Sequence, residues 1–118
     1  LLMPIDSYQI DVNYVSRFYN HNFSITVKNQ EIQQINRNCM TNIDAKELDC
    51  AELAPFTDEE FLISGLFRHA EDGERRGFGS TVRYSVLGYP RLIILNDMGY
   101  TGARIGKWEV TRFEILFN

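Results

Sequence analysis

The stretch TDEEFLISGLFRHAE (residues 57–71) decides the fold class, because it holds the one helical pattern in a chain otherwise rich in strand patterns. Thr57 is a natural N-cap residue, and Glu60 three positions later completes a capping box, while Phe56 can pack on Phe61 as a hydrophobic staple. The acidic residues 58–60 suit the positive end of a helix dipole. Apolar residues recur at helical spacing at Phe61, Leu62, Leu66, Phe67 and Ala70. The pattern predicts a helix of about fifteen residues that ends near Glu71, with a stop at Gly73.

Strand patterns precede this helix. Residues 8–14 alternate apolar and polar side chains, which is the period of a half-buried strand, and residues 23–27 repeat the pattern after the turn-forming residues 19–22. A second turn at Asn29-Gln30 leads into a third strand over residues 31–35. The first third of the chain therefore predicts an antiparallel meander.

Three more strand patterns follow the helix. Residues 72–80 (DGERRGFGS) have the composition of a loop, and strands are expected over residues 82–86, 91–95 and 108–117. The apolar phase slips between Val110 and Phe113, which predicts a β-bulge near Thr111-Arg112.

These elements define the expected architecture. We predict an α+β fold over a single domain (residues 1–118), with one curved antiparallel sheet of about six strands in the order β-β-β-α-β-β-β. The one main helix packs on one face of the sheet and buries its apolar stripe there.

Composition limits the classes of partner. The net charge of −4 gives no general attraction for nucleic acid or for anionic lipid. No apolar run approaches the ~20 residues needed to cross a bilayer. The chain opens at Leu1 without an initiator Met, so we expect a further segment upstream.

Cys39 and Cys50 lie in a polar stretch that indicates a connection rather than core. We favour a disulfide between them, with two unrelated thiols as the alternative, and it would stabilise the fold by roughly 3 kcal/mol. A disulfide implies an oxidising compartment. A metal site is not expected, because the two histidines, His21 and His69, are distant in the sequence.

The segment VRYSVLGYPRLIILND (residues 82–97) contains a Gly-Tyr-Pro that fits a hairpin connection. Gly88 can adopt a positive φ and Pro90 fixes its own φ. The functional alternative is that Tyr89 projects from this reversal as a contact residue. Asp97 fits a turn-former better than a metal ligand, because Met98 and Gly99 follow it.

No catalytic motif is present: neither histidine has a nucleophile beside it, and we expect neither a cofactor nor a metal. Arginines 75, 76, 83 and 91 are interpreted as a solvated basic face, with an anionic partner or lipid headgroup as the alternative. Tyrosine, tryptophan and arginine side chains suit a contact surface, although aromatic residues more often belong to the core. The candidate binding residues are Tyr84, Tyr89, Arg91, Asp97, Tyr100 and Trp108.

The chain resembles a family of small bacterial lipoproteins of unknown function. The resemblance runs from about residue 7 to residue 117, through SYQIDVNY, FSITVKNQEI and TVRYSVLGYPRLIILND, and depends mainly on Tyr84, Gly88, Tyr89, Pro90, Ile94 and Asp97. It implies an exported protein, periplasmic or at the cell surface, whose lipid-bearing cysteine lies upstream of Leu1. It implies no activity.

We therefore expect a non-catalytic binding or interaction module for an unknown protein or small ligand. It would be a monomer or weak dimer, and it would contact the membrane only through its lipid anchor. One alternative is an inhibitor or immunity-type protein that blocks a partner enzyme. A second is a hydrolytic enzyme with a His or carboxylate in a cleft between helix and sheet.

Overall fold

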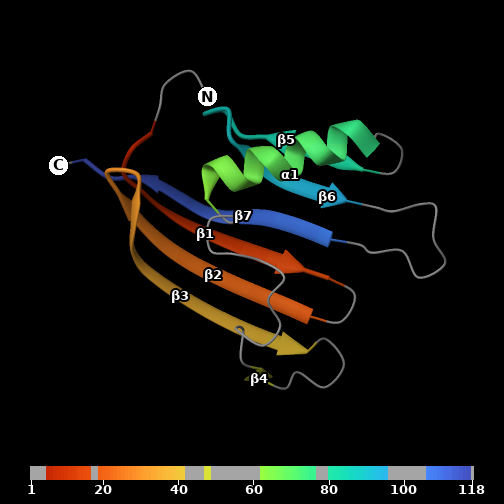
Figure 1. The fold of residues 1–118 in the computed structure, drawn as a ribbon, viewed down its shortest axis with the longest axis horizontal. Coiled ribbons are helices and arrows are strands. Elements are labelled where there is room, and N and C mark those ends of the chain that lie inside the picture. Colours follow the sequence, from red (N-terminus) through yellow and green to blue (C-terminus); the bar gives the residue numbers. More distant parts are fainter. Residues whose placement is uncertain are drawn as a thin grey trace.

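A computed structural model describes residues 5–16, 19–41, 47–48, 62–76, 80–95 and 106–117. Within these residues the chain forms eight elements (Figure 1). They are β1 (Tyr8–Val15), β2 (Tyr19–Lys28), β3 (Glu31–Thr41), β4 (Glu47–Leu48), α1 (Ile63–Arg76), β5 (Thr81–Tyr84), β6 (Pro90–Leu95) and β7 (Gly106–Ile115).

All the strands belong to one antiparallel sheet, in the spatial order β4-β3-β2-β1-β7-β6-β5. The predicted α+β class, with one helix and one antiparallel sheet, is confirmed. The predicted strand order needs correction, because the two-residue strand β4 lies between β3 and α1. The last strand, β7, pairs with the first, β1, so the two ends of the sequence meet in the middle of the sheet.

The turn predicted at Asn29-Gln30 is confirmed, and it fixes the register of β2 against β3. Both residues have positive φ, 52° and 66°. Positive φ at both central residues is the geometry of the type I′ turn, whose twist matches that of the flanking strands. The Gln30 N–H donates to the Asp6 carbonyl at 2.8 Å, which ties the turn to the start of β1.

The helix differs from the prediction at both ends. α1 begins at Ile63, and its first turn carries no acidic residue, so the expected charge–dipole pairing is absent from this helix. The proposed cap and staple, residues 56–61, lie outside the described residues. At the other end α1 continues through Gly73 to Arg76, and residues 72–76 are therefore helical instead of loop.

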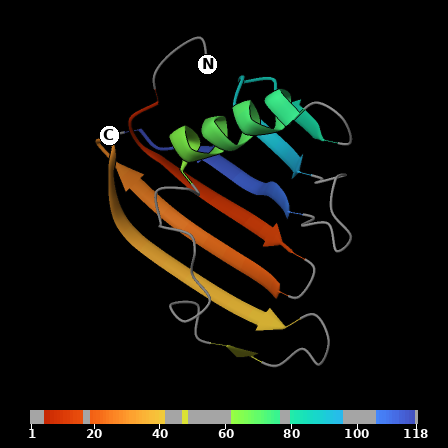
Figure 2. The same cartoon turned by 45° about the vertical axis from the view of Figure 1, so that its right-hand side comes forward.

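The core lies between α1 and one face of the curved sheet (Figure 2). Every second residue of β1 faces it, which gives the strand a strictly alternating burial pattern. Seven apolar side chains of this described core cluster are at most 1% exposed: Ile10, Val12, Ile25, Val27, Leu66, Ala70 and Ile93. α1 lies over the end of the sheet formed by β5, β6 and β7, and β2 and β3 extend beyond it (Figure 2).

The predicted bulge is confirmed at Thr111. Asp11 on β1 pairs with Arg112 on β7, whereas the next residue, Val12, pairs with Val110. Thr111 is therefore the extra residue, and its hydroxyl donates to the Asp11 carbonyl at 3.3 Å. Because the extra residue absorbs the phase slip, apolar side chains on both sides of it face the core.

The Gly-Tyr-Pro segment forms the hairpin connection between β5 and β6, as predicted. The Gly88 N–H donates to the Ser85 carbonyl at 3.0 Å, and the Ser85 N–H donates to the Tyr89 carbonyl at 2.8 Å. Gly88 has φ of 95°, a conformation that favours glycine.

Candidate functional site

The candidate binding residues from the sequence do not form one surface. Asp97 and Tyr100 lie outside the described residues. Tyr89 is 9% exposed and Trp108 is 4% exposed, so both are core residues. Tyr89 does not project from the hairpin: its ring packs on the Phe113 ring, with centroids 4.5 Å apart.

Tyr84 and Arg91 are the two candidates that reach solvent. Tyr84 is 47% exposed, and its hydroxyl donates to Glu74 Oε1 on α1 at 2.8 Å. That hydrogen bond, together with desolvation and the negative charges of Glu74 and Glu71, raises the pKa of the Tyr84 phenol. Tyr84 and Arg91 both belong to the β5–β6 hairpin.

Trp108 packs against two other rings in the core. The centroid of the His69 ring lies 4.3 Å from that of Trp108, and the Tyr14 ring lies 4.6 Å away. This stack joins α1, β1 and β7. Its role is to fix the helix on the sheet.

His21 and Cys39 face each other on β2 and β3, with Nδ1 of His21 3.2 Å from Sγ of Cys39. Burial lowers the pKa of the His21 imidazole. Cys39 has no exposed surface, so a substrate has no access to this pair. The prediction that Cys39 lies in a connection outside the core is therefore wrong, because Cys39 is a buried residue of β3. The pair does not have the accessibility of a catalytic dyad.

The predicted disulfide cannot be followed to its second cysteine, because Cys50 lies outside the described residues. Within them there is no free cysteine thiol. The link therefore stays a prediction.

The open face of the sheet carries a feature that the sequence analysis did not single out. Strand register places nine side chains of β1, β2 and β3 in three rows across this face. We call them the amide-rich face. The rows are Asn13, Asn22 and Asn38; Asp11, Ser24 and Asn36; and Gln9, Thr26 and Gln34.

Hydrogen bonds order the β1 side of the amide-rich face. Asp11 Oδ1 accepts from the Ser24 hydroxyl at 2.8 Å and from Gln9 Nε2 at 3.0 Å. Asn13 Nδ2 donates to Oδ1 of Asn20 and to Oδ1 of Asn22, both at 2.7 Å. These contacts hold the side chains in fixed orientations toward solvent.

The β3 side of the same face is different. The side chains of Asn36 and Asn38 are exposed, and they make no hydrogen bond within the described part of the chain. Each amide offers two donor hydrogens and an acceptor oxygen. The hydrogen-bonded side chains of β1 and β2 thus lie beside amides of β3 that are available to a ligand.

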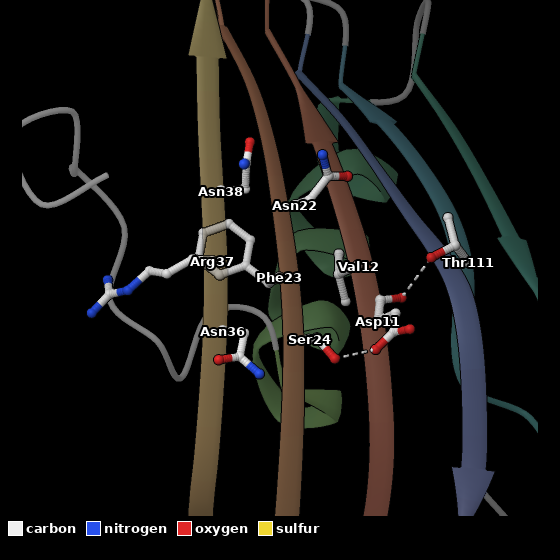
Figure 3. Close-up of a pocket in the computed structure, with 9 residues that line it drawn as sticks. All are labelled: Asp11, Val12, Asn22, Phe23, Ser24, Asn36, Arg37, Asn38 and Thr111. Carbon is white, nitrogen blue, oxygen red and sulfur yellow. Dashed lines mark hydrogen bonds between the residues drawn. The ribbon is translucent and has the colours of Figure 1, made fainter. Parts of the chain in front are cut away.

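A hollow of about 330 Å³ lies on this face, between the ordered side chains of β1 and the amides of β3 (Figure 3). Asn22, Ser24, Asn36, Asn38, Asp11 and Thr111 line it, together with residues 12, 23 and 37. The Arg37 guanidinium points away from the hollow, past the edge of β3 (Figure 3). Asp11 is therefore the one charged side chain directed into the described hollow, and the remaining polar groups are uncharged amides and hydroxyls.

A second cavity, of about 410 Å³, lies at the start of α1 and is mainly apolar; Tyr8, Val27 and Ile63 are among its lining residues. Its described lining carries no charged side chain, so we assign no site to it. Neither hollow is lined by a histidine. No group of three or more His, Cys, Asp or Glu side chains that could hold a metal ion occurs within the described residues.

The sequence held a signal for the amide-rich face. Polar residues of β1 and β2 alternate with core residues, and most of them are Asn, Gln, Ser or Thr instead of Lys or Glu. Alternation alone indicates a face exposed to solvent and does not distinguish an amide-rich surface from an ordinary one. Its concentration of amides becomes visible only when register places three strands side by side.

No protein-family model matches the chain, and no curated protein or solved structure shows significant similarity to it. The resemblance to bacterial lipoproteins therefore stays a prediction. No helix among the described residues is both long and apolar enough to cross a membrane.

Proposed function

We propose that this protein is a non-catalytic binding domain whose amide-rich face takes an uncharged ligand rich in hydroxyl groups, such as a saccharide. The observation that carries the proposal is the row of asparagines across β1, β2 and β3 and the hollow beside it.

Asparagine is a costly choice at these positions. It is depleted from β-strands, and strand propensities measured in one host span about 1 kcal/mol. Five asparagines nevertheless occupy strand positions on this one face: Asn13, Asn20, Asn22, Asn36 and Asn38. A side chain that weakens its own strand and contributes nothing to the core is typical of a functional surface.

The chemistry of the hollow fits hydroxyl groups. A sugar hydroxyl both donates and accepts, and so does a side-chain amide. The ordered Asp11 and Ser24 and the available Asn36 and Asn38 can contact opposite sides of one ring. An anionic ligand would approach the Asp11 carboxylate with no cation directed into the described hollow, so the charge distribution favours a neutral ligand.

The geometry also sets the expected strength of binding. The volume of about 330 Å³ is at the lower end of the range of ligand sites, roughly 300–1,000 Å³. No aromatic side chain from the three rows is available to stack on a sugar ring. We expect dissociation constants on the order of 1 mM, equivalent to about −4 kcal/mol.

The test is a titration of isotope-labelled protein with maltose and, separately, with N,N′-diacetylchitobiose, followed by nuclear magnetic resonance. The side-chain amide signals of Asn22, Asn36 and Asn38 should shift and saturate. In Asn36→Thr/Asn38→Thr the affinity should fall at least tenfold. Lys28→Thr is the matched control, because Lys28 is an exposed residue of β2 outside the hollow, and it should bind as the original protein does.

A stability measurement separates function from structure. The double threonine variant should unfold at higher urea concentration, with a gain of about 0.5 kcal/mol per position, because threonine suits strands better. A loss of stability would show that the two amides support the fold. Absence of saturable shifts with both disaccharides would overturn the choice of ligand.

The proposal includes export and a lipid tether, as the resemblance implies. The inference of export depends partly on the predicted disulfide. The position of β4 supports that disulfide. Leu48 pairs with Cys39, and the two residues from Leu48 to Cys50 span at most about 7 Å, so a link is within reach. Thiol alkylation of the denatured, unreduced protein tests it: two reactive thiols would contradict both the disulfide and the inference of an oxidising compartment.

A further inference from the structure

The β5–β6 hairpin ends in two apolar side chains that have no cover. The relative exposure of Val86 is 104% and that of Leu87 is 47%. The Gly88–Ser85 hydrogen bond makes them the two central residues of a β-turn. Such positions usually carry Gly, Asn, Asp, Ser or Pro, so Val and Leu there are not explained by the turn.

The same hairpin is locally cationic in an acidic protein. Residues 80–95 contain Arg83 and Arg91 and no acidic residue, while the whole chain has a net charge of −4. Both arginines are exposed, and neither makes an ion pair within the described part of the chain. Glu74 of α1 contacts the hairpin by accepting a hydrogen bond from the Tyr84 hydroxyl.

We propose that this hairpin tip binds the surface of an anionic lipid bilayer. Val86 and Leu87 enter the boundary between headgroups and acyl chains, and Arg83 and Arg91 contact lipid phosphates. Apolar groups with flanking cations and an amphipathic ring, here that of Tyr84, are the combination that favours the membrane interface.

The dimensions of the hairpin suit this arrangement. Arg83 precedes Val86 by three residues, which is about 10 Å along a strand. Interfacial segments bury their apolar side chains about 5–10 Å into the headgroup boundary. The guanidinium groups therefore lie at headgroup depth when the tip is inserted. The two hairpin hydrogen bonds fix the turn before contact, so little ordering is needed on binding.

The test is co-sedimentation of the intact protein with vesicles of phosphatidylcholine alone and of phosphatidylcholine with phosphatidylglycerol. Binding should be measurable with the anionic vesicles and several-fold weaker with the neutral ones. Arg83→Gln and Arg91→Gln should each weaken binding about fivefold, and raised salt should weaken it too. Val86→Ser/Leu87→Ser should weaken binding at least tenfold while retaining both arginines.

Phe117→Ser is the matched control, because Phe117 is also an exposed apolar residue, 89% exposed, but lies outside the hairpin. It should bind as the original protein does. Equal loss in the Phe117 and hairpin variants would mean a non-specific apolar effect and would overturn the proposal. So would a protein that stays in the supernatant with anionic vesicles. Far-UV circular dichroism of each variant verifies that it is folded.

Discussion

Gly106→Ala is expected to destabilise the protein through a single added methyl group. A Cβ at this position would lie 3.1 Å from Cζ3 and 3.3 Å from Cη2 of Trp108, and 3.4 Å from Cε2 of Tyr14. Relief would require the indole to move, but the rings of His69 and Tyr14 both pack against it. The Gly106 backbone is not in the left-handed region, so the contact with the rings sets the effect.

Two opposing terms give the magnitude. Overpacking of a filled core typically costs about 1–3 kcal/mol. Alanine also restricts the unfolded chain, which contributes about 0.4–1 kcal/mol in favour of folding. The net loss should be about 1–2 kcal/mol, and with a urea dependence of about 2 kcal/mol per molar the midpoint falls by about 0.5–1 M.

The assay is built into the site, because Trp108 is the only tryptophan of the chain. Urea unfolding followed by its fluorescence, with circular dichroism as a second probe, reports both stability and local packing. Arg112→Ala on the same strand is the control, since Arg112 is exposed and its ion pair with Glu114 is open to solvent. A Gly106→Ala protein with an unchanged or higher midpoint would refute the packing argument.

Two further predictions concern backbone strain and protonation. Gln30→Gly should raise stability by about 0.5–1 kcal/mol, because Gln30 has a φ of 66° that costs a residue with a Cβ, while its side-chain bond to Asp6 is exposed; a lower urea midpoint would contradict this. His21 should make stability fall as pH drops below about 6.5, the pKa of an unfolded histidine, because burial lowers its folded pKa and the unfolded state then binds the proton first. The slope for one such group is at most about 1.4 kcal/mol per pH unit, and urea titrations from pH 7.5 to 5.5 should show a flatter dependence in His21→Gln. An equal dependence in both proteins would exclude His21 as its source.

Local signals in the sequence predicted most of the strands and the turn at Asn29-Gln30, but the turn expected over residues 19–22 is wrong, because these residues belong to β2. The alternation in residues 8–14 reflects a strand with one buried face, and a slip of that alternation has one local cause, an extra residue, which is Thr111. The turn at Asn29-Gln30 is likewise specified by adjacent residues. Such features are predictable because the sequence signal and the structure that it specifies lie in the same short segment.

The helix start and the neighbours of β7 required information that local patterns lack. Thr57 and Glu60 form a good capping box on paper, yet α1 begins at Ile63, where the chain reaches the core through Ile63 and Leu66. The pairing of β7 with β1 joins residues more than ninety positions apart, as between Asn13 and Glu109. Nothing in either strand alone specifies that partner.

The exposure of aromatic residues also depends on tertiary packing, which local patterns do not specify. Tyr89 and Trp108 have amphipathic rings that suit a contact surface, but their depth depends on what packs over them. The uncharged amides of Asn36 and Asn38 carry no local signal of a site, because the site forms only with the neighbouring strand β2. Residue type indicates which side chains can form a contact surface. Their position in the fold determines which of them are exposed.

The placement of the two proposed surfaces makes them independent. β5 forms one edge of the sheet, and β2, at the middle of the amide-rich face, is four strands away. At about 4.8 Å per strand the separation is about 20 Å, which exceeds the depth to which an interfacial segment enters a bilayer. A molecule held by Val86 and Leu87 therefore keeps its hollow in water. Vesicle-bound protein should take up maltose as strongly as free protein does, and competition between the two ligands would show that the surfaces overlap.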